Sequence, residues 1–247
     1  MNRLRFYGGV GIFAAMIGVL LTLGFWQLAR LEWKNSLLAA RGSALSLPPR
    51  VLTNIDDLPS NYSRLIIRGS FMGGTETRWL GRFDGEQSGI EVLQAFKIPR
   101  AGAGAKSQEA IIWVNRGFIA NGATGAIAEI PLLGSDSPTE VMGWLMPRPK
   151  AGAFTPQNHP EQNLWYWPDL ASLCDRLVLT SPCIEEHYLL LHNQSPPAPA
   201  DRIKIVKNLP ELVNNHLQYA ITWFSLALIL VVVFVFLVRR GLIRAKN

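Results

Sequence analysis

The sequence predicts a membrane protein in which two transmembrane α-helices flank one mostly antiparallel β (α+β) extracytoplasmic domain. Three observations predict this class. Apolar runs without charge lie near both ends of the chain, over residues 6–28 and 226–238. Short runs of β-branched and aromatic residues, separated by glycine-containing turns, fill the region between them. Basic residues gather in both tails.

The first transmembrane helix is predicted over residues 7–29, because about 20 apolar residues cross the hydrocarbon core of a bilayer. Arg3 and Arg5 before the run are also typical of a signal peptide. The run is too long for one, however, and no small-x-small cleavage pattern follows it, so a retained anchor is expected. The small residues of this segment share one face of the helix: Gly11, Ala15, Gly18 and Thr22. This face predicts close packing against another helix, which Gly18→Leu would disturb.

The central domain is predicted over residues 30–209, a length that fits one core. Strands are expected at 63–71, 77–82, 90–98, 110–119, 140–146 and 184–192, and a helix at 168–176. Strand–helix–strand repeats are missing from the pattern, so an antiparallel sheet or small barrel is predicted. Cys174 and Cys183 are close enough in sequence for a disulfide outside the cytoplasm. Two free thiols are nevertheless the favoured interpretation.

The second helix is predicted over residues 210–238, with Asn208 as its cap and Pro210 in its first turn. The formal net charge is +6, from 24 Lys and Arg against 18 Asp and Glu, and the tails at 1–6 and 239–247 carry this whole excess. Positive tails stay in the cytoplasm. Both termini are therefore expected to be cytoplasmic and the central domain periplasmic. The basic composition is explained by topology and does not indicate nucleic-acid binding.

Enzyme motifs are missing from the sequence. There is no His-Glu-x-x-His zinc motif, no Cys-x-x-Cys-His motif for covalent haem, and no nucleophile elbow around Ser88. No acid–base pair that would carry catalysis can be named. We therefore expect that the protein is not an enzyme.

Two polar and aromatic stripes are predicted where the helices meet the outer membrane face. Trp26, Arg30 and Trp33 share one face of the first helix, and His216 and Trp223 share one face of the second. If the stripes lie at one depth, they supply an axial imidazole, apolar walls and a cation for propionates, which are the parts of a non-covalent haem site. The alternative is an interfacial aromatic belt with a snorkelling arginine, which composition alone favours.

Several segments resemble those of a known family and follow in the same order. They are GFWQLARLEWK at 24–34, WVNRGFI at 113–119, PQNHP at 156–160, WYWPD at 165–169 and NNHLQYAITWF at 214–224. The chain resembles the SURF1 (Surfeit locus 1) family of cytochrome c oxidase assembly factors. It is similar to bacterial members, because no Ser/Arg-rich extension precedes the first anchor.

The resemblance implies a multi-pass protein of the inner membrane that assists the assembly of haem-copper (aa3-type) cytochrome c oxidase. It implies haem a insertion into subunit I, with haem a held non-covalently and His216 as the candidate iron ligand. The implied partners are oxidase subunit I, haem a synthesis or insertion factors, and membrane lipids, with no nucleic acid. A scaffold that binds oxidase subunits without haem is the alternative, and an enzyme of haem or thiol chemistry is a weaker one.

Two motifs of the domain are interpreted as structural. Asn115-Arg116-Gly117 is interpreted as a turn at the end of a strand, where the backbone conformation requires these residues. Trp165, Tyr166, Trp167 and Asp169 are interpreted as core or rim residues.

Overall fold

The computed structural model describes residues 3–99, 109–122, 137–177, 181–197, 203–205, 209 and 212–246, of which 3–6, 99 and 241–246 are described by their backbone alone. The chain forms two compact units. The first, called the helix pair, contains Met1–Ala40 and Glu211–Asn247. The second, called the barrel domain, contains Arg41–Pro210.

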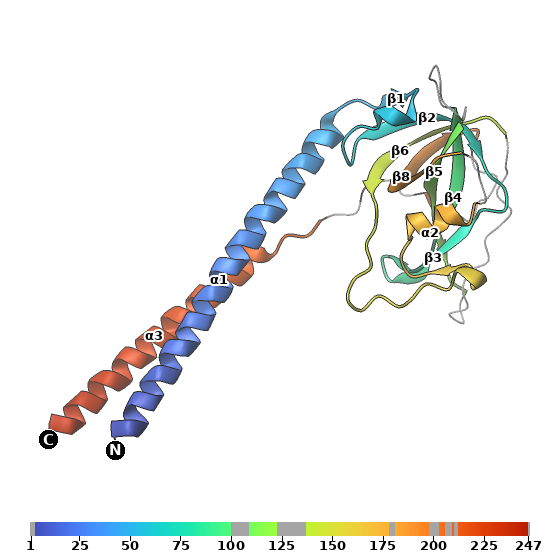
Figure 1. Ribbon diagram of the computed structural model, residues 1–247. Coiled ribbons are helices and arrows are strands. Elements are labelled where there is room, and N and C mark those ends of the chain that lie inside the picture. The colour runs from blue at the N-terminus through green and yellow to red at the C-terminus, as the bar shows by residue number, and fades with distance from the viewer. Residues whose placement is uncertain are drawn as a thin grey trace. The chain divides into compact units, whose positions relative to one another are not determined.

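The helix pair consists of α3 (His216–Lys246) and of α1 (Arg3–Ser46) as far as Ala40, and the end of α1 belongs to the barrel domain (Figure 1). Both helices are long and apolar enough to cross a membrane, which confirms the two predicted membrane helices. The first helix continues beyond residue 29, because the sequence from there to Ser46 is rich in leucine and alanine and contains no proline. It ends just before Pro48 and Pro49, which disfavour helical conformation in the residue before them.

The second helix begins at His216, and the predicted start at Pro210 is wrong. Residues 212–215 are not helical. Two asparagines supply the cap instead. The Asn215 carbonyl accepts from the Tyr219 amide at 3.2 Å, and the Asn214 side chain accepts from the His216 amide at 3.4 Å. The predicted cap Asn208 lies outside the described residues.

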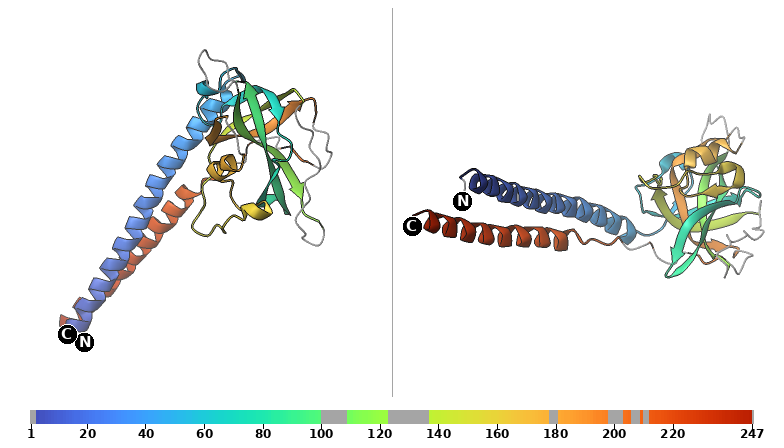
Figure 2. Two further views of the ribbon diagram at one scale, coloured as in Figure 1. Left: turned by 45° about the vertical axis from the view of Figure 1, so that its right-hand side comes forward. Right: turned by 90° about the horizontal axis from the view of Figure 1, so that it is seen from below.

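The two helices run antiparallel. Figures 1 and 2 show them side by side, with both chain ends at the same end of the pair. The ring contacts agree, since Phe13 packs on Phe234 with centroids 5.8 Å apart and Phe25 packs on Phe224 at 5.3 Å. Both tails therefore emerge on the same side of the pair, as the tail charges predict.

The barrel domain contains, within its described residues, an eight-stranded sheet in the order β1-β2-β6-β8-β5-β4-β3-β7. The strands are β1 (Arg50–Leu52), β2 (Arg64–Phe71), β3 (Thr77–Asp84), β4 (Gln87–Pro99), β5 (Glu109–Ala120), β6 (Thr139–Pro147), β7 (Leu164–Trp165) and β8 (Cys183–Ser195). All six predicted strands are present. β2 also pairs with β4, so β2, β6, β8, β5 and β4 close into a barrel.

Antiparallel pairs dominate the sheet, as predicted. Three pairs are parallel, namely β1–β2, β3–β7 and β5–β8. Barrel closure depends on Gly69, because a Cβ there would lie 1.9 Å from the Lys97 carbonyl oxygen on the facing strand. A larger residue at position 69 would therefore force β2 away from β4.

Alternation along the strands produces two main cores on opposite faces of the sheet, and a smaller third cluster includes Ile90 and Val92. One set of side chains, including Leu65, Ile112 and Leu189, fills the barrel interior. The opposite set, including Trp113 and Leu190, packs with α2 (Leu170–Asp175) in an outer core. β5 and β8, which contribute side chains to both cores, are therefore buried on both faces.

A disulfide joins Cys174 in α2 to Cys183 in β8, with Cα atoms 5.8 Å apart. The expectation of two free thiols is wrong. Sequence spacing alone did not show that the end of α2 packs against the start of β8, which brings the two cysteines within bonding geometry. The bond is typical of a domain outside the cytoplasm.

Candidate functional site

The contact face of the helix pair differs from the predicted one. Gly11 and Gly18 face open space, since nothing lies within 4 Å of a Cβ built at either position. The close approach occurs at Gly24, where a Cβ would lie 2.6 Å from the Phe224 ring. Ala220 on α3 is buried at the same interface. The predicted packing through Gly11, Ala15 and Gly18 is therefore wrong, because a run of small residues does not show which face meets the partner helix.

Gln27 brings a polar group to this contact face. Its side chain is only 9% exposed, one helical turn from Gly24. Its Oε1 lies 2.8 Å from Nδ1 of His216. Because a carbonyl oxygen can only accept, the imidazole donates from Nδ1–H, and Nε2 then carries the lone pair. This is the state in which histidine binds a metal through Nε2.

A second polar contact ties the start of α3 to α1. Asn214 Nδ2 donates to Asn35 Oδ1 at 2.9 Å, while Asn214 Oδ1 accepts from the His216 amide. The backbone and the ring of His216 are therefore both connected to α1. Nothing in the sequence pairs Gln27 with His216, although a lone glutamine in an apolar helix and a histidine at a helix start are each visible as costly polar groups.

The predicted site residues lie on two different stripes. His216 and Trp223 lie on the face of α3 that meets α1, and both are partly buried. Trp26 is 53% exposed, and Arg30 is exposed as well, with its guanidinium 4.4 Å from the Trp33 ring centroid. Position 26 lies about 100° around the helix from position 27, so Trp26 does not share the Gln27 face. Arg30 lies about one turn beyond Gln27, but its side chain is exposed. Their predicted role in haem binding remains a prediction.

Trp223 carries an unsatisfied donor. Its indole Nε1 is buried and has no hydrogen-bond acceptor within the part of the chain that is described. It lies two turns along the same face of α3 as His216. A bare Nε2 on His216 fits a haem group, because an imidazole nitrogen is a ligand of haem iron.

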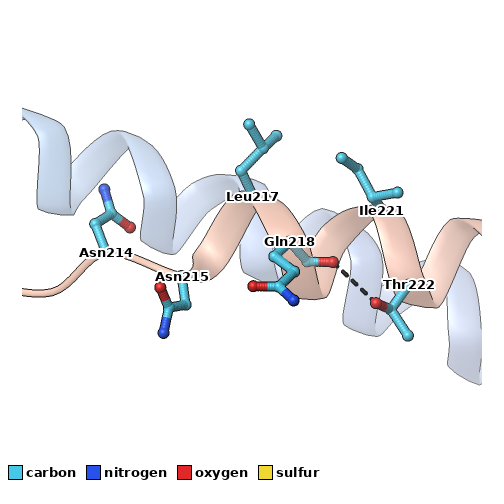
Figure 3. A pocket seen from close by; sticks show the side chains of 6 residues that line it. All are labelled: Asn214, Asn215, Leu217, Gln218, Ile221 and Thr222. Carbon is cyan, nitrogen blue, oxygen red and sulfur yellow. Dashed lines mark hydrogen bonds between the residues drawn. The ribbon is translucent and has the colours of Figure 1, made fainter.

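An open pocket lies along the start of α3 (Figure 3), and its helical lining residues lie about 100–240° around the helix axis from His216. Its lining comes from the first two turns of the helix and the two residues before it: Asn214, Asn215, Leu217, Gln218, Ile221 and Thr222. The Thr222 hydroxyl donates to the Gln218 carbonyl at 2.9 Å, so that polar group is satisfied within the helix. The pocket does not include His216, and its lining contains no imidazole, thiolate or carboxylate.

In the barrel domain, Asn115-Arg116-Gly117 forms a β-bulge inside β5 and not the predicted turn at a strand end. Val92 pairs with Gly117 and Leu93 pairs with Asn115, so Arg116 is the additional residue. Gly117 has φ +127, and Asn115 Oδ1 accepts its amide at 3.0 Å. The motif is structural, as expected, but its physical role is to direct one side chain into the barrel.

That side chain is a buried cation. Arg116 is 2% exposed, donates to Gln94 Oε1 at 2.5 Å and to Gln194 Oε1 at 3.1 Å, and lies 3.8 Å from the Phe71 ring centroid. Burial lowers the pKa of Arg116 to about 10, and the charge of Glu76 opposes that shift. The guanidinium stays charged at neutral pH and cross-links β5, β4 and β8 inside the barrel.

The segments PQNHP (156–160) and WYWPD (165–169) are hydrogen-bonded to each other. Asn158 accepts from the Tyr166 amide at 2.8 Å and donates to the Trp167 carbonyl at 3.0 Å. Trp165 is fully buried in the outer core. The interpretation of the Trp165–Asp169 segment as core and rim is confirmed for Trp165.

The fold and these contacts define a class of protein, in which an apolar antiparallel helix pair with a tethered histidine accompanies a closed β-barrel domain. The profile of the SURF1 family matches residues 14–228. The chain is 31% identical to a SURF1-like protein of Rickettsia bellii over 220 residues, covering 87% of this chain and 85% of that protein. It is 29% identical to a SURF1-like protein of Rickettsia felis over 229 residues, covering 91% and 94%. It is 26% identical to human Surfeit locus protein 1 over 233 residues, covering 83% and 69%. The chain belongs to the SURF1 family.

Proposed function

We propose that the protein is a membrane-anchored, non-enzymatic assembly factor for haem-copper (aa3-type) cytochrome c oxidase that assists haem a insertion into subunit I. The resemblance to the SURF1 family implies the oxidase and the haem. The observation that carries the assignment to particular residues is the 2.8 Å bond between Gln27 and His216, which leaves Nε2 of the imidazole available as a ligand.

In this proposal His216 would hold haem a through Nε2, the ring nitrogen left without a proton, and Trp223 would supply an apolar wall. The bound haem would supply an iron that takes an imidazole nitrogen as ligand. A single imidazole on a helix pair suits a group that is held briefly and passed on, since few protein contacts then have to break. Oxidase subunit I and haem a synthesis or insertion factors are the proposed partners.

The proposed location is the inner membrane, with both termini in the cytoplasm and the barrel domain in the periplasm. Two membrane-length helices that run antiparallel, basic tails and a disulfide in the barrel domain all support it.

The test is the haem a content of the oxidase in a strain that lacks the gene. Without the protein we expect a partial loss of the oxidase haem a absorption in membranes, because slower unassisted insertion remains. The wild-type gene should restore it, and His216→Ala should not, at equal protein levels in immunoblots. Full restoration by His216→Ala would favour the alternative of a scaffold that binds oxidase subunits without haem.

A further inference from the structure

The GFWQLARLEWK segment of α1 is not explained by membrane anchoring, which needs only apolar length. Two of its members, Gly24 and Gln27, are in close contact with α3. Gly24 lets the Phe224 ring approach to a distance that no side chain would tolerate, and Gln27 is buried opposite His216. The glycine therefore brings the helices together at the level where the glutamine can reach the ring.

The contacts on both sides of this point fix how α3 slides and rotates against α1. Phe224 packs on Phe25 on one side of His216 along α3, and Asn214 bonds Asn35 on the other. With both ends held, the imidazole has little freedom to leave Gln27. The 2.8 Å distance between Gln27 Oε1 and His216 Nδ1 is consequently a property of the helix register and not of one flexible side chain.

We propose that Gln27 is a positioning residue for His216: its side-chain carbonyl keeps the proton on Nδ1 and turns Nε2 away from α1. A neutral imidazole has two tautomers, and the hydrogen-bond partner of one ring nitrogen determines which nitrogen carries the proton. An apolar residue at position 27 would leave either nitrogen free to carry it. The use of the free Nε2 as a haem ligand rests on the proposed function. The tautomer itself is a property of the protein without haem.

The experiment is ¹⁵N NMR of the histidine-labelled full-length protein in lipid nanodiscs, at about pH 8 where imidazole is neutral. The His216 signals are assigned by their absence from the His216→Ala spectrum. In the wild type we expect the shifts of an Nδ1–H, Nε2-bare ring. Gln27→Leu keeps the size and helix preference of residue 27 but removes the acceptor, so we expect the ring to change tautomer or to exchange between the two.

Gln27→Glu is the conservative variant, and it should keep the wild-type tautomer because a carboxylate also accepts from Nδ1–H. Gln218→Leu is the matched control for the tautomer, since it removes the same type of side chain from the other side of α3. An Nε2–H ring in the wild type, or the same tautomer in wild type and Gln27→Leu, would overturn the proposal.

Haem titration of the same samples separates this proposal from the proposed function. Gln27→Leu should weaken haem a binding by about 10–100-fold, as loss of a partner behind a metal-binding histidine does. Gln27→Glu should bind nearly as the wild type does. Absence of haem binding by the wild type, with the tautomer change still present in Gln27→Leu, would reject the haem function and leave the positioning role of Gln27 standing.

Discussion

Single side chains carry the most specific features of this molecule, and two of them are polar groups in apolar surroundings. His216 is tied through Nδ1 to Gln27, and Arg116 is enclosed in the barrel between two glutamine carbonyls. Both cases follow the rule that a buried polar group needs a partner. In the helix pair the partner leaves one ring nitrogen of His216 available to a ligand. In the barrel the partners take both terminal guanidinium nitrogens, and the Nε of Arg116 is enclosed without a partner among the described residues. The first arrangement suits binding, and the second suits stability.

Replacement of Arg116 tests the structural role of the bulge. Arg116→Leu should lower the free energy of unfolding by about 2–4 kcal/mol, because Gln94 and Gln194 lose their donor inside the barrel. Denaturant unfolding of the purified protein, followed by tryptophan fluorescence, measures it. Arg68→Leu is the control, since Arg68 pairs with Glu140 at an exposed site and should change stability by less than about 1 kcal/mol. Equal losses in the two variants would contradict the role given to Arg116.

At the scale of elements, the sequence predicted six of the eight described strands, α2 and the membrane helices, because hydrophobic alternation and apolar length are local signals. It did not predict the short strands β1 and β7. It did not predict the contact face of α1, the start of α3 or the disulfide. The sequence offers a plausible packing face at Gly11, Ala15 and Gly18. The face of α1 that meets α3 is instead determined by the fit of the Phe224 ring against Gly24. Such choices depend on the partner element, which no local pattern contains.

The corrected contact face gives a prediction for the helix pair. Gly24→Leu should separate α1 from α3, because its side chain would occupy the space of the Phe224 ring, while Gly18→Leu should have little effect within the pair. Cross-linking of Phe13→Cys with Phe234→Cys, two facing positions, measures the contact. A fall in yield for Gly18→Leu with no change for Gly24→Leu would restore the face predicted from sequence.

The disulfide between α2 and β8 has its own test. Cys174→Ser combined with Cys183→Ser should lower the stability of the protein by about 2–3 kcal/mol, since the unfolded chain regains the freedom of a short loop. Denaturant unfolding with and without reductant measures it. Thiol labelling of the unfolded wild-type protein before reduction is the check, and modification of both cysteines would show that the bond is absent.

At the scale of the whole molecule, the antiparallel arrangement of the two helices and the charges of the tails predict the same membrane topology. The antiparallel helices place both tails on one side, and six excess positive charges lie in those tails (Figure 1). Reporter fusions should therefore find both termini inside and a fusion near Glu140 outside. Activity of a periplasmic reporter at the C-terminus would contradict this topology. The membrane helices and the topology could be predicted from sequence, because apolar length and tail charge can be read directly along the chain. The contact between Gln27 and His216 could not be predicted, because the two residues are 189 positions apart and meet only in the folded structure.

The most direct test of the central claim is the absorption spectrum of the protein purified from a host that produces haem a. The wild type should carry a low-spin haem a spectrum, and His216→Ala should lose it while remaining in the membrane, because alanine offers no donor to iron. His192→Ala is the control, since His192 stacks on Trp144 in the barrel domain and should leave the spectrum unchanged. A normal haem spectrum in His216→Ala, or a colourless wild-type protein, would contradict the assignment of His216 as the haem ligand.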